Sequence, residues 1–272
     1  MALGRLGSCE FDLLSDADLL FVCDESTDRD KMRQLAEQTM HALTLYTRDG
    51  AIFAVDTRLR PHGYEGELVV TPAQLSTYFA GDAKPWEALT YLRLRYVAGD
   101  ADLAASVVDL VREKLPAMAR DPAFGDDLEV VRMRLAKSDL RPNLKTAEGG
   151  TYDIDYIVGK LQVRHSLWSP ANLRDRVAVV HAAGFLETSD ATALQQNARI
   201  LRSIERAIRL ATGQTLKWIP AADHARRSIL HLLAGLVAEK ESPELLLTRV
   251  LQQNREIYRK YQGRDGASGS LR

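Results

Sequence analysis

The chain has few of the features that would assign it to several large classes of protein. It has only two cysteines in 272 residues, and neither has partner cysteines or histidines at the spacing of a zinc site. Its net charge is -1, so no overall positive field favours nucleic acid or an anionic membrane surface. No apolar run approaches the ~20 residues that cross a bilayer. We therefore expect a cytoplasmic protein in which Cys9 and Cys23 are reduced.

Two carboxylates stand at the head of an apolar run near the N-terminus. Asp16 and Asp18 are separated by one residue and precede the apolar residues 19–22. Alternate side chains of a strand face the same side, so the two acids would project together and repel each other. A Mg²⁺ ion would remove that repulsion, and this ion takes one or two carboxylates together with phosphate oxygens. A solvated strand start is the alternative interpretation of the acidic pair taken alone.

A glycine-containing turn precedes the acidic pair. Residues 4–8 read Gly-Arg-Leu-Gly-Ser, and glycine lets the backbone come close to a ligand. Exposed N–H groups in such a turn can hold phosphate. The turn followed by the two acids therefore suggests a metal-bound nucleotide triphosphate, and we predict nucleotide-binding roles for Gly7, Ser8 and Ser15.

A third acid ends a second apolar run that could pair beside the first. Three carboxylates on adjacent strands can bind two metal ions, so we predict that Asp16, Asp18 and Asp56 are catalytic and metal-binding. Arg58 and Arg60 alternate with Asp56 on the extension of the same strand. On a shared face they would neutralise phosphate charge in the transition state, which predicts nucleotide binding. A salt bridge to the acidic cluster is the alternative for both arginines.

The hydrophobic pattern changes period near Thr71. Before this point it predicts strands over 18–23 and 51–56, a helix over 31–46, and a hairpin or short edge strand over 63–70. After it, the 3.6-residue period predicts helices over 72–79, 86–97, 100–115, 126–137, 151–167, 173–183, 190–210, 224–238 and 243–261. We therefore predict an α+β protein with a small mixed sheet over residues 1–70 and an all-helical domain over 71–262. The Gly/Ser-rich tail 263–272 is predicted to be disordered.

These motifs, in this order, resemble the nucleotidyltransferase signature of the glutamine synthetase adenylyltransferase family. Residues 4–8, 15–21 and 55–61 carry the signature, which continues through 86–95 and 145–156. The resemblance spans roughly residues 2–240 and implies a catalytic fold similar to DNA polymerase beta. It also implies that AMP passes from ATP, with two Mg²⁺ ions, to a tyrosine of glutamine synthetase.

The loop that continues the signature contains further candidate residues. Lys145, Glu148 and Asp153 flank a Gly-Gly turn that leads into a helix. They either line the nucleotide cleft, which predicts nucleotide binding by Lys145 and Glu148, or serve the start of the helix. In the second interpretation Thr151 is the cap and the helix dipole favours Asp153.

The chain also departs from the family pattern. Family members carry two nucleotidyltransferase copies, one attaching AMP and one removing it by phosphorolysis, whereas this chain carries one copy whose strand before Gly4 we expect to be clipped. Ser8 stands where a second glycine is usual, and Asp155 where glutamate is usual. Glu148 and Asp153 around the Gly-Gly turn look more like the second, adenylylating copy. Phosphorolytic deadenylylation by the same type of site stays open, as does a non-catalytic fragment that binds glutamine synthetase or the PII signalling protein.

Overall fold

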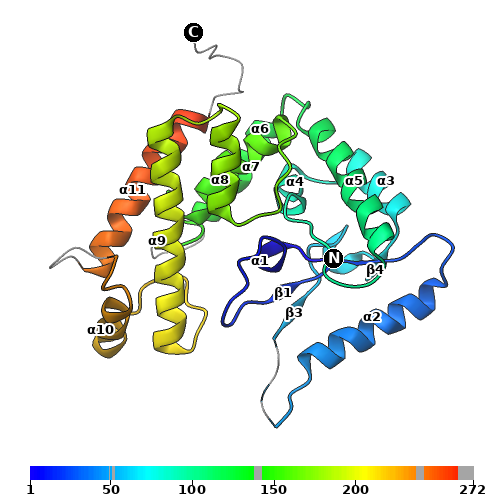
Figure 1. Ribbon diagram of the computed structural model, residues 1–272, viewed down its shortest axis with the longest axis horizontal. Coiled ribbons are helices and arrows are strands. Elements are labelled where there is room, and N and C mark those ends of the chain that lie inside the picture. The colour runs from blue at the N-terminus through cyan, green and yellow to red at the C-terminus, as the bar shows by residue number, and fades with distance from the viewer. Residues whose placement is uncertain (49, 51–52, 138–142, 237–241, 263–272) are drawn as a thin grey trace. The chain divides into compact units, whose positions relative to one another are not determined.

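The computed structural model describes residues 1–48, 50, 53–137, 143–236 and 242–262. It has the predicted α+β fold, with short parallel strands in two small sheets and helices around them (Figure 1). The predicted tail 263–272 and the start of the predicted strand at 51–52 lie outside the described residues. No helix in the described part of the chain is long and apolar enough to cross a membrane.

The chain divides into two compact units. The first comprises residues 1–125 with 163–172, and the second comprises residues 126–162 with 173–272. The change of hydrophobic period near Thr71 falls inside the first unit, because helices after that residue pack with the strands in one compact body.

Within the described residues of the first unit, four two-residue strands form two parallel pairs. They are β1 (Ala17–Asp18) with β3 (Val55–Asp56), and β2 (Phe21–Val22) with β4 (Val69–Val70). The continuous strand predicted over 18–23 is therefore divided, because each half bonds a different partner. Of the two alternatives predicted over 63–70, the hairpin is wrong and the short edge strand is confirmed, since η1 (Gly63–Glu65) is a 3₁₀ turn and β4 pairs, among the described residues, only with β2, in parallel.

The first residues of the chain lie beside β1. The N–H of Leu3 donates to the carbonyl of Asp18 at 2.9 Å. Ala2 forms isolated antiparallel bridges with Leu19 and with Arg95, far along the chain. This short segment delivers the glycine turn directly to the strand that carries Asp18.

Helices complete the first unit. They are α1 (Gly4–Gly7), α2 (Arg29–Thr44), α3 (Pro72–Gly81), α4 (Pro85–Tyr91) and α5 (Ala101–Met118). The side chain of Thr71 and that of Gln74 form a reciprocal capping box that starts α3 where the sequence predicts it. The rings of Phe79 and Tyr91 meet edge to face at 4.9 Å in the core. Helix α4 ends six residues before the prediction, since Arg95 leaves it to bridge with Ala2.

The described residues of the second unit form α-helices joined by loops, with no strand among them. Its helices are α6 (Phe124–Ala136), α7 (Thr151–Arg164), α8 (Leu173–Ala182), α9 (Thr188–Thr212), α10 (Asp223–Leu232) and α11 (Pro243–Gln262), of which α6 begins and α7 ends in the first unit. Helix α9 packs against α8, α10 and α11 (Figure 1). Leu194, Leu201 and Ile208 recur along its buried stripe, as the amphipathic pattern predicts.

Candidate functional site

The register of β1 and β3 brings the predicted acids together. Asp18 is directly opposite Asp56 on the parallel pair, and Asp16 lies two residues before Asp18. Burial, followed by the negative charges of Asp56 and Asp16, raises the pKa of Asp18 to about 6, whereas Arg93 and Arg58 oppose the rise. Near neutral pH Asp18 therefore carries a negative charge that its surroundings compensate incompletely. Such a group favours the approach of a cation.

Asp56 is held by the residue two positions after it. The backbone N–H of Arg58 donates to Oδ1 at 2.8 Å and its Nε donates to Oδ2 at 2.7 Å, while Nη2 also bonds Oδ2. Burial acts to raise the pKa of Asp56, but the bonds from Arg58 outweigh it and the pKa is lowered. Of the two interpretations of Arg58, the structure adopts the salt bridge.

The three carboxylates do not form a preassembled metal centre. In the described part of the chain, no three His, Cys, Asp or Glu side chains are arranged to hold a metal ion. The donor chemistry nevertheless suits a hard divalent cation, because Asp16 is exposed, Asp18 bears excess negative charge and all three groups offer oxygen. An ion shared by all three would require Arg58 to release Asp56.

Arg60 does not lie on an extension of β3, contrary to the prediction, although its charge acts on Asp56. β3 ends at Asp56 and the chain turns, so the strand does not extend to Arg60. Its guanidinium donates to the carbonyls of Thr57 at 3.0 Å, Tyr64 at 3.2 Å and Gly66 at 3.1 Å, and it is buried. Arg60 therefore closes the loop that follows β3.

The glycine turn is the single helical turn α1. Its amides were predicted to be exposed, but they are hydrogen-bonded within the turn. The N–H of Gly7 donates to the carbonyl of Leu3 at 2.7 Å, and the N–H of Ser8 donates to the carbonyl of Gly4 at 3.1 Å. The Ser8 hydroxyl also donates to the carbonyl of Gly4, at 3.0 Å. In this conformation, therefore, the amides of Gly7 and Ser8 are used inside the turn and are not exposed phosphate donors.

Gly4 and Ser15 shape the surroundings of the acids. Gly4 has φ +50°, and a Cβ on it would lie 1.9 Å from Oδ2 of Asp18, so only glycine allows this approach. The hydroxyl of buried Ser15 lies 3.3 Å from both the N–H and Oδ1 of Asp12, which closes the turn before Asp16. Sequence reasoning missed Gly4 as a site residue, although it is the first glycine of the motif. It also missed Arg93, for which the motif over 86–95 was the available signal.

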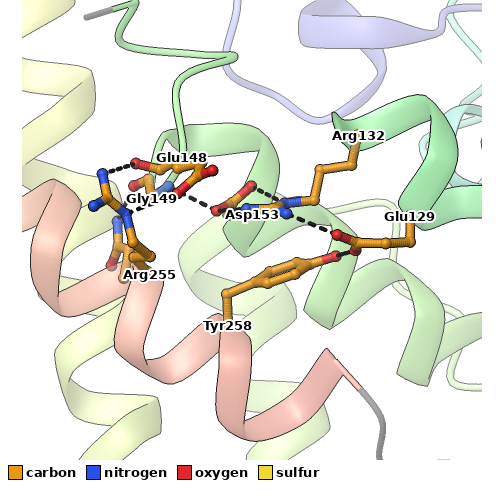
Figure 2. Close-up of polar contacts among 8 residues, drawn as sticks. Glu129, Arg132, Glu148, Gly149, Asp153, Arg255 and Tyr258 are labelled. Atoms are coloured by element: carbon orange, nitrogen blue, oxygen red, sulfur yellow. Dashed lines mark hydrogen bonds and ion pairs between the residues drawn. The ribbon is translucent and has the colours of Figure 1, made fainter. Parts of the chain in front are cut away.

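Lys145 and Glu148 lie in the second unit and have partners there. The Lys145 ammonium is 3.6 Å from a carboxylate oxygen of Glu205 on α9. Nε of Arg255 on α11 lies 3.2 Å from a carboxylate oxygen of Glu148, and both side chains are partly exposed (Figure 2). The two predicted residues thus come from one loop but contact different helices. Their predicted nucleotide binding stays a prediction.

Asp153 is the centre of a buried polar network in the second unit. Figure 2 shows Arg132 bound to its carboxylate through Nε at 2.7 Å and Nη2 at 2.9 Å. The same carboxylate accepts the N–H of Gly149 at 2.6 Å. The guanidinium of Arg132 lies 3.9 Å from the ring centroid of Tyr258. Asp153 therefore orders the loop at the start of α7 through Arg132 and the N–H of Gly149. The expected effect of the helix dipole stays a prediction.

Thr151 departs from its expected role, and Asp155 has a distant partner that the sequence did not predict. The hydroxyl of Thr151 donates to the carbonyl of Leu144 at 3.3 Å, so it bonds the preceding loop and is not seen as a cap. Asp155 accepts a bond of 2.8 Å from Arg176, whose side chain is almost completely buried. The aspartate that replaces the usual glutamate thus takes part in a buried ion pair.

Comparison with known proteins divides the chain in two. Residues 1–109 match the family model described as glutamate-ammonia ligase adenylyltransferase, and residues 128–261 match the model described as GlnD PII-uridylyltransferase. A bifunctional glutamine synthetase adenylyltransferase/adenylyl-removing enzyme of Streptomyces coelicolor is 32% identical over 77% of this chain and 23% of its own length. The enzyme of the same name from Rhodopseudomonas palustris is 30% identical over 94% of this chain and 27% of its own length. The chain thus spans about a quarter of the relatives it matches.

Because the pKa of Asp18 is raised, a substitution that removes its charge should stabilise the protein, and the gain should depend on pH. The pKa of Asp18 is about 6 in the folded protein, against an ordinary value of 3.8. Its negative charge therefore lowers the free energy of unfolding in full above pH 6, and has no effect below pH 3.8, where the group is protonated in both states. Without divalent cations, Asp18→Asn should raise the free energy of unfolding by about 1–3 kcal/mol at pH 7.5 and by much less at pH 4. Denaturant unfolding at several pH values measures this. Asp109→Asn on the exposed face of α5 is the control, and an equal gain at both pH values would contradict the prediction.

The buried network predicts a large loss of stability in the second unit. Asp153→Asn should cost about 1.5–3 kcal/mol, because it removes the charged partner that binds two nitrogens of Arg132 and leaves this guanidinium only its pair with Glu129. Glu148→Gln, which breaks a partly exposed pair, should cost less than about 1 kcal/mol. Hydrogen exchange of the amides in α7 and α11 reports on this unit separately. Equal protection in the two variants would show that the network contributes little.

Proposed function

We propose that this chain, which belongs to the glutamate-ammonia ligase adenylyltransferase family, transfers AMP from ATP to a tyrosine of glutamine synthetase. The in-register pairing of Asp18 with Asp56, beside the glycine turn, is the observation that carries the proposal. Asp16 adds a third carboxylate, and its charge acts on Asp18. A purely binding surface has no use for three clustered carboxylates of which one is held partly buried with a raised pKa.

In the proposed reaction, the tyrosine oxygen attacks the α-phosphorus of ATP and pyrophosphate leaves. A tyrosine hydroxyl loses its proton near pH 10, so it needs a positioned base at neutral pH. Asp56 takes that proton once Arg58 releases its carboxylate. While Arg58 is bound, its lowered pKa keeps Asp56 ionised; release of Arg58 removes most of that lowering and makes the carboxylate a stronger base. Arg58, freed from Asp56, neutralises charge on the phosphates.

Asp16 and Asp18 are the residues that would hold Mg²⁺, joined by Asp56 when it leaves Arg58. The bound ions would supply positive charge that screens the triphosphate from the carboxylates. Asp18 gains most from a cation, because burial and its two acidic neighbours make its charge the most costly of the three. Gly4 contributes by letting the turn approach this carboxylate without a side chain between them.

The direction of the reaction and the second partner are part of the proposal. The loop around Glu148 and Asp153 favours adenylylation, and phosphorolytic removal of AMP would use the same acids. The match of residues 128–261 to a PII-uridylyltransferase model supports the PII signalling protein as a partner of the helical unit.

Transfer of label from ATP tests the function directly. The chain is incubated with Mg²⁺, glutamine synthetase and ATP labelled at the α-phosphate, and label should enter a tyrosine of glutamine synthetase. A parallel reaction gives the chain adenylylated glutamine synthetase with phosphate, which would release ADP if the chain is a deadenylylase. If no label is transferred and no ADP is released, but the chain binds glutamine synthetase, the chain is a binding fragment instead.

Asp56→Asn keeps the shape of the side chain and removes its charge. The rate of transfer should fall by a factor on the order of a hundred or more, the scale for losing a positioned base. Binding of ATP with Mg²⁺ should change little, because Asp16 and Asp18 are intact. Asp16→Asn should weaken both binding and transfer, and Asp109→Asn should affect neither. A parental rate in Asp56→Asn would show that Asp56 is structural.

A further inference from the structure

The segment after α4 is hydrogen-bonded to the first residues of the chain and to the glycine turn. Arg95 exchanges two backbone hydrogen bonds with Ala2, at 2.7 and 3.0 Å. Its guanidinium donates through Nε to the carbonyl of Gly7 at 3.2 Å and through Nη2 to the carbonyl of Leu6 at 2.6 Å. These carbonyls end α1, where a positive charge is favourable. One side chain thus fixes the C-terminal end of the turn.

The same segment leaves no free space behind the turn. A Cβ on Gly7 would lie 2.2 Å from the carbonyl oxygen of Arg93, and one on Gly4 would meet the carboxylate of Asp18. The backbone of α1 is therefore enclosed between Arg93 on one side and Asp18 on the other. The close approach on both sides needs glycine at both positions, and the two bonds from Arg95 hold the end of the turn in this place.

We propose that Arg95 is a positioning residue of the nucleotide site, which fixes the Gly4–Ser8 turn against the carboxylate of Asp18, the group that would hold the metal-bound triphosphate. The inference rests on the proposed function for the identity of the nucleotide. Arg95 contacts neither the acids nor the substrate in this account, and it acts through the carbonyls of Leu6 and Gly7. The preceding Arg93 brings a positive charge that acts on Asp18 from the same segment.

The fork of Arg95 explains why arginine serves this task. The planar guanidinium of Arg95 donates from two nitrogens to the carbonyls of Leu6 and Gly7. A lysine ammonium has one nitrogen and cannot make both bonds with the same geometry. Arg95→Gln removes the charge and one donor, whereas Arg95→Lys keeps the charge. Partial recovery in the lysine variant is therefore expected for a positioning role.

The test compares ATP binding and transfer in the full chain. Arg95→Gln should raise the dissociation constant of ATP with Mg²⁺, measured by calorimetry, about tenfold, and lower kcat/KM by about a hundredfold, the scale of a 1 Å misplacement. Arg95→Lys should recover part of both losses. Arg29→Gln is the matched control, because Arg29 also donates to a carbonyl, that of Val69, but does not contact the turn. It should leave ATP binding and KM at the parental values.

The outcomes separate this inference from the proposed function. If the parent binds ATP with Mg²⁺ but transfers no AMP, the proposed reaction fails, and weaker binding in Arg95→Gln still supports the positioning role. Parental ATP affinity in Arg95→Gln would overturn the inference even if transfer occurs. Equal weakening in Arg29→Gln would also overturn it, since the effect would then be general destabilisation. A parent that does not bind ATP with Mg²⁺ overturns both proposals.

Discussion

The parallel pairing of β1 with β3 is the constraint on which the candidate site depends. Its register places Asp18 opposite Asp56, so two like charges share one face of a partly buried pair. Coulomb repulsion and loss of solvent both disfavour the second charge. The fold relieves this only in part, because Arg58 binds Asp56 directly whereas Asp18 keeps a pKa near 6. A site of this kind favours the approach of a cation, because a positive charge would offset the cost of the second negative charge.

Glycines mark the points where backbone must come close to another group. Gly4 and Gly7 let α1 lie between a carboxylate and a carbonyl, with Arg95 bonded across the end of the turn. Gly149 does the same in the second unit, since a Cβ on it would lie 1.9 Å from the carbonyl oxygen of Leu251. The amide of Asn254 then donates to the carbonyl of Gly149 at 2.7 Å. In both units a close approach is stabilised by a charged or amide side chain from a distant helix or loop.

Much of the helical structure was predictable from local signals. Helix α3 begins at its capping box, and α9 and α11 begin and end within two residues of their amphipathic patterns. The strands were harder to predict from the sequence. A strand of two residues is too short to show an alternating hydrophobic pattern, and it is defined by the strand that it pairs with. The apolar run after Asp18 reads as one strand, yet it bonds β3 through its first half and β4 through its second.

The sequence by itself determined the α+β class, the main helices, the three acids and the order of motifs that indicates the family. Only the tertiary structure decided which charges are paired. Arg58 binds Asp56, whereas Arg60 turns into its own loop, although the two arginines look equivalent in the sequence. Asp153 finds Arg132 from 21 residues away, and Arg95 reaches the glycine turn from 88 residues away. Sequence spacing cannot reveal such pairs. They form because folding brings distant helices and loops together, and because a buried polar group needs a partner.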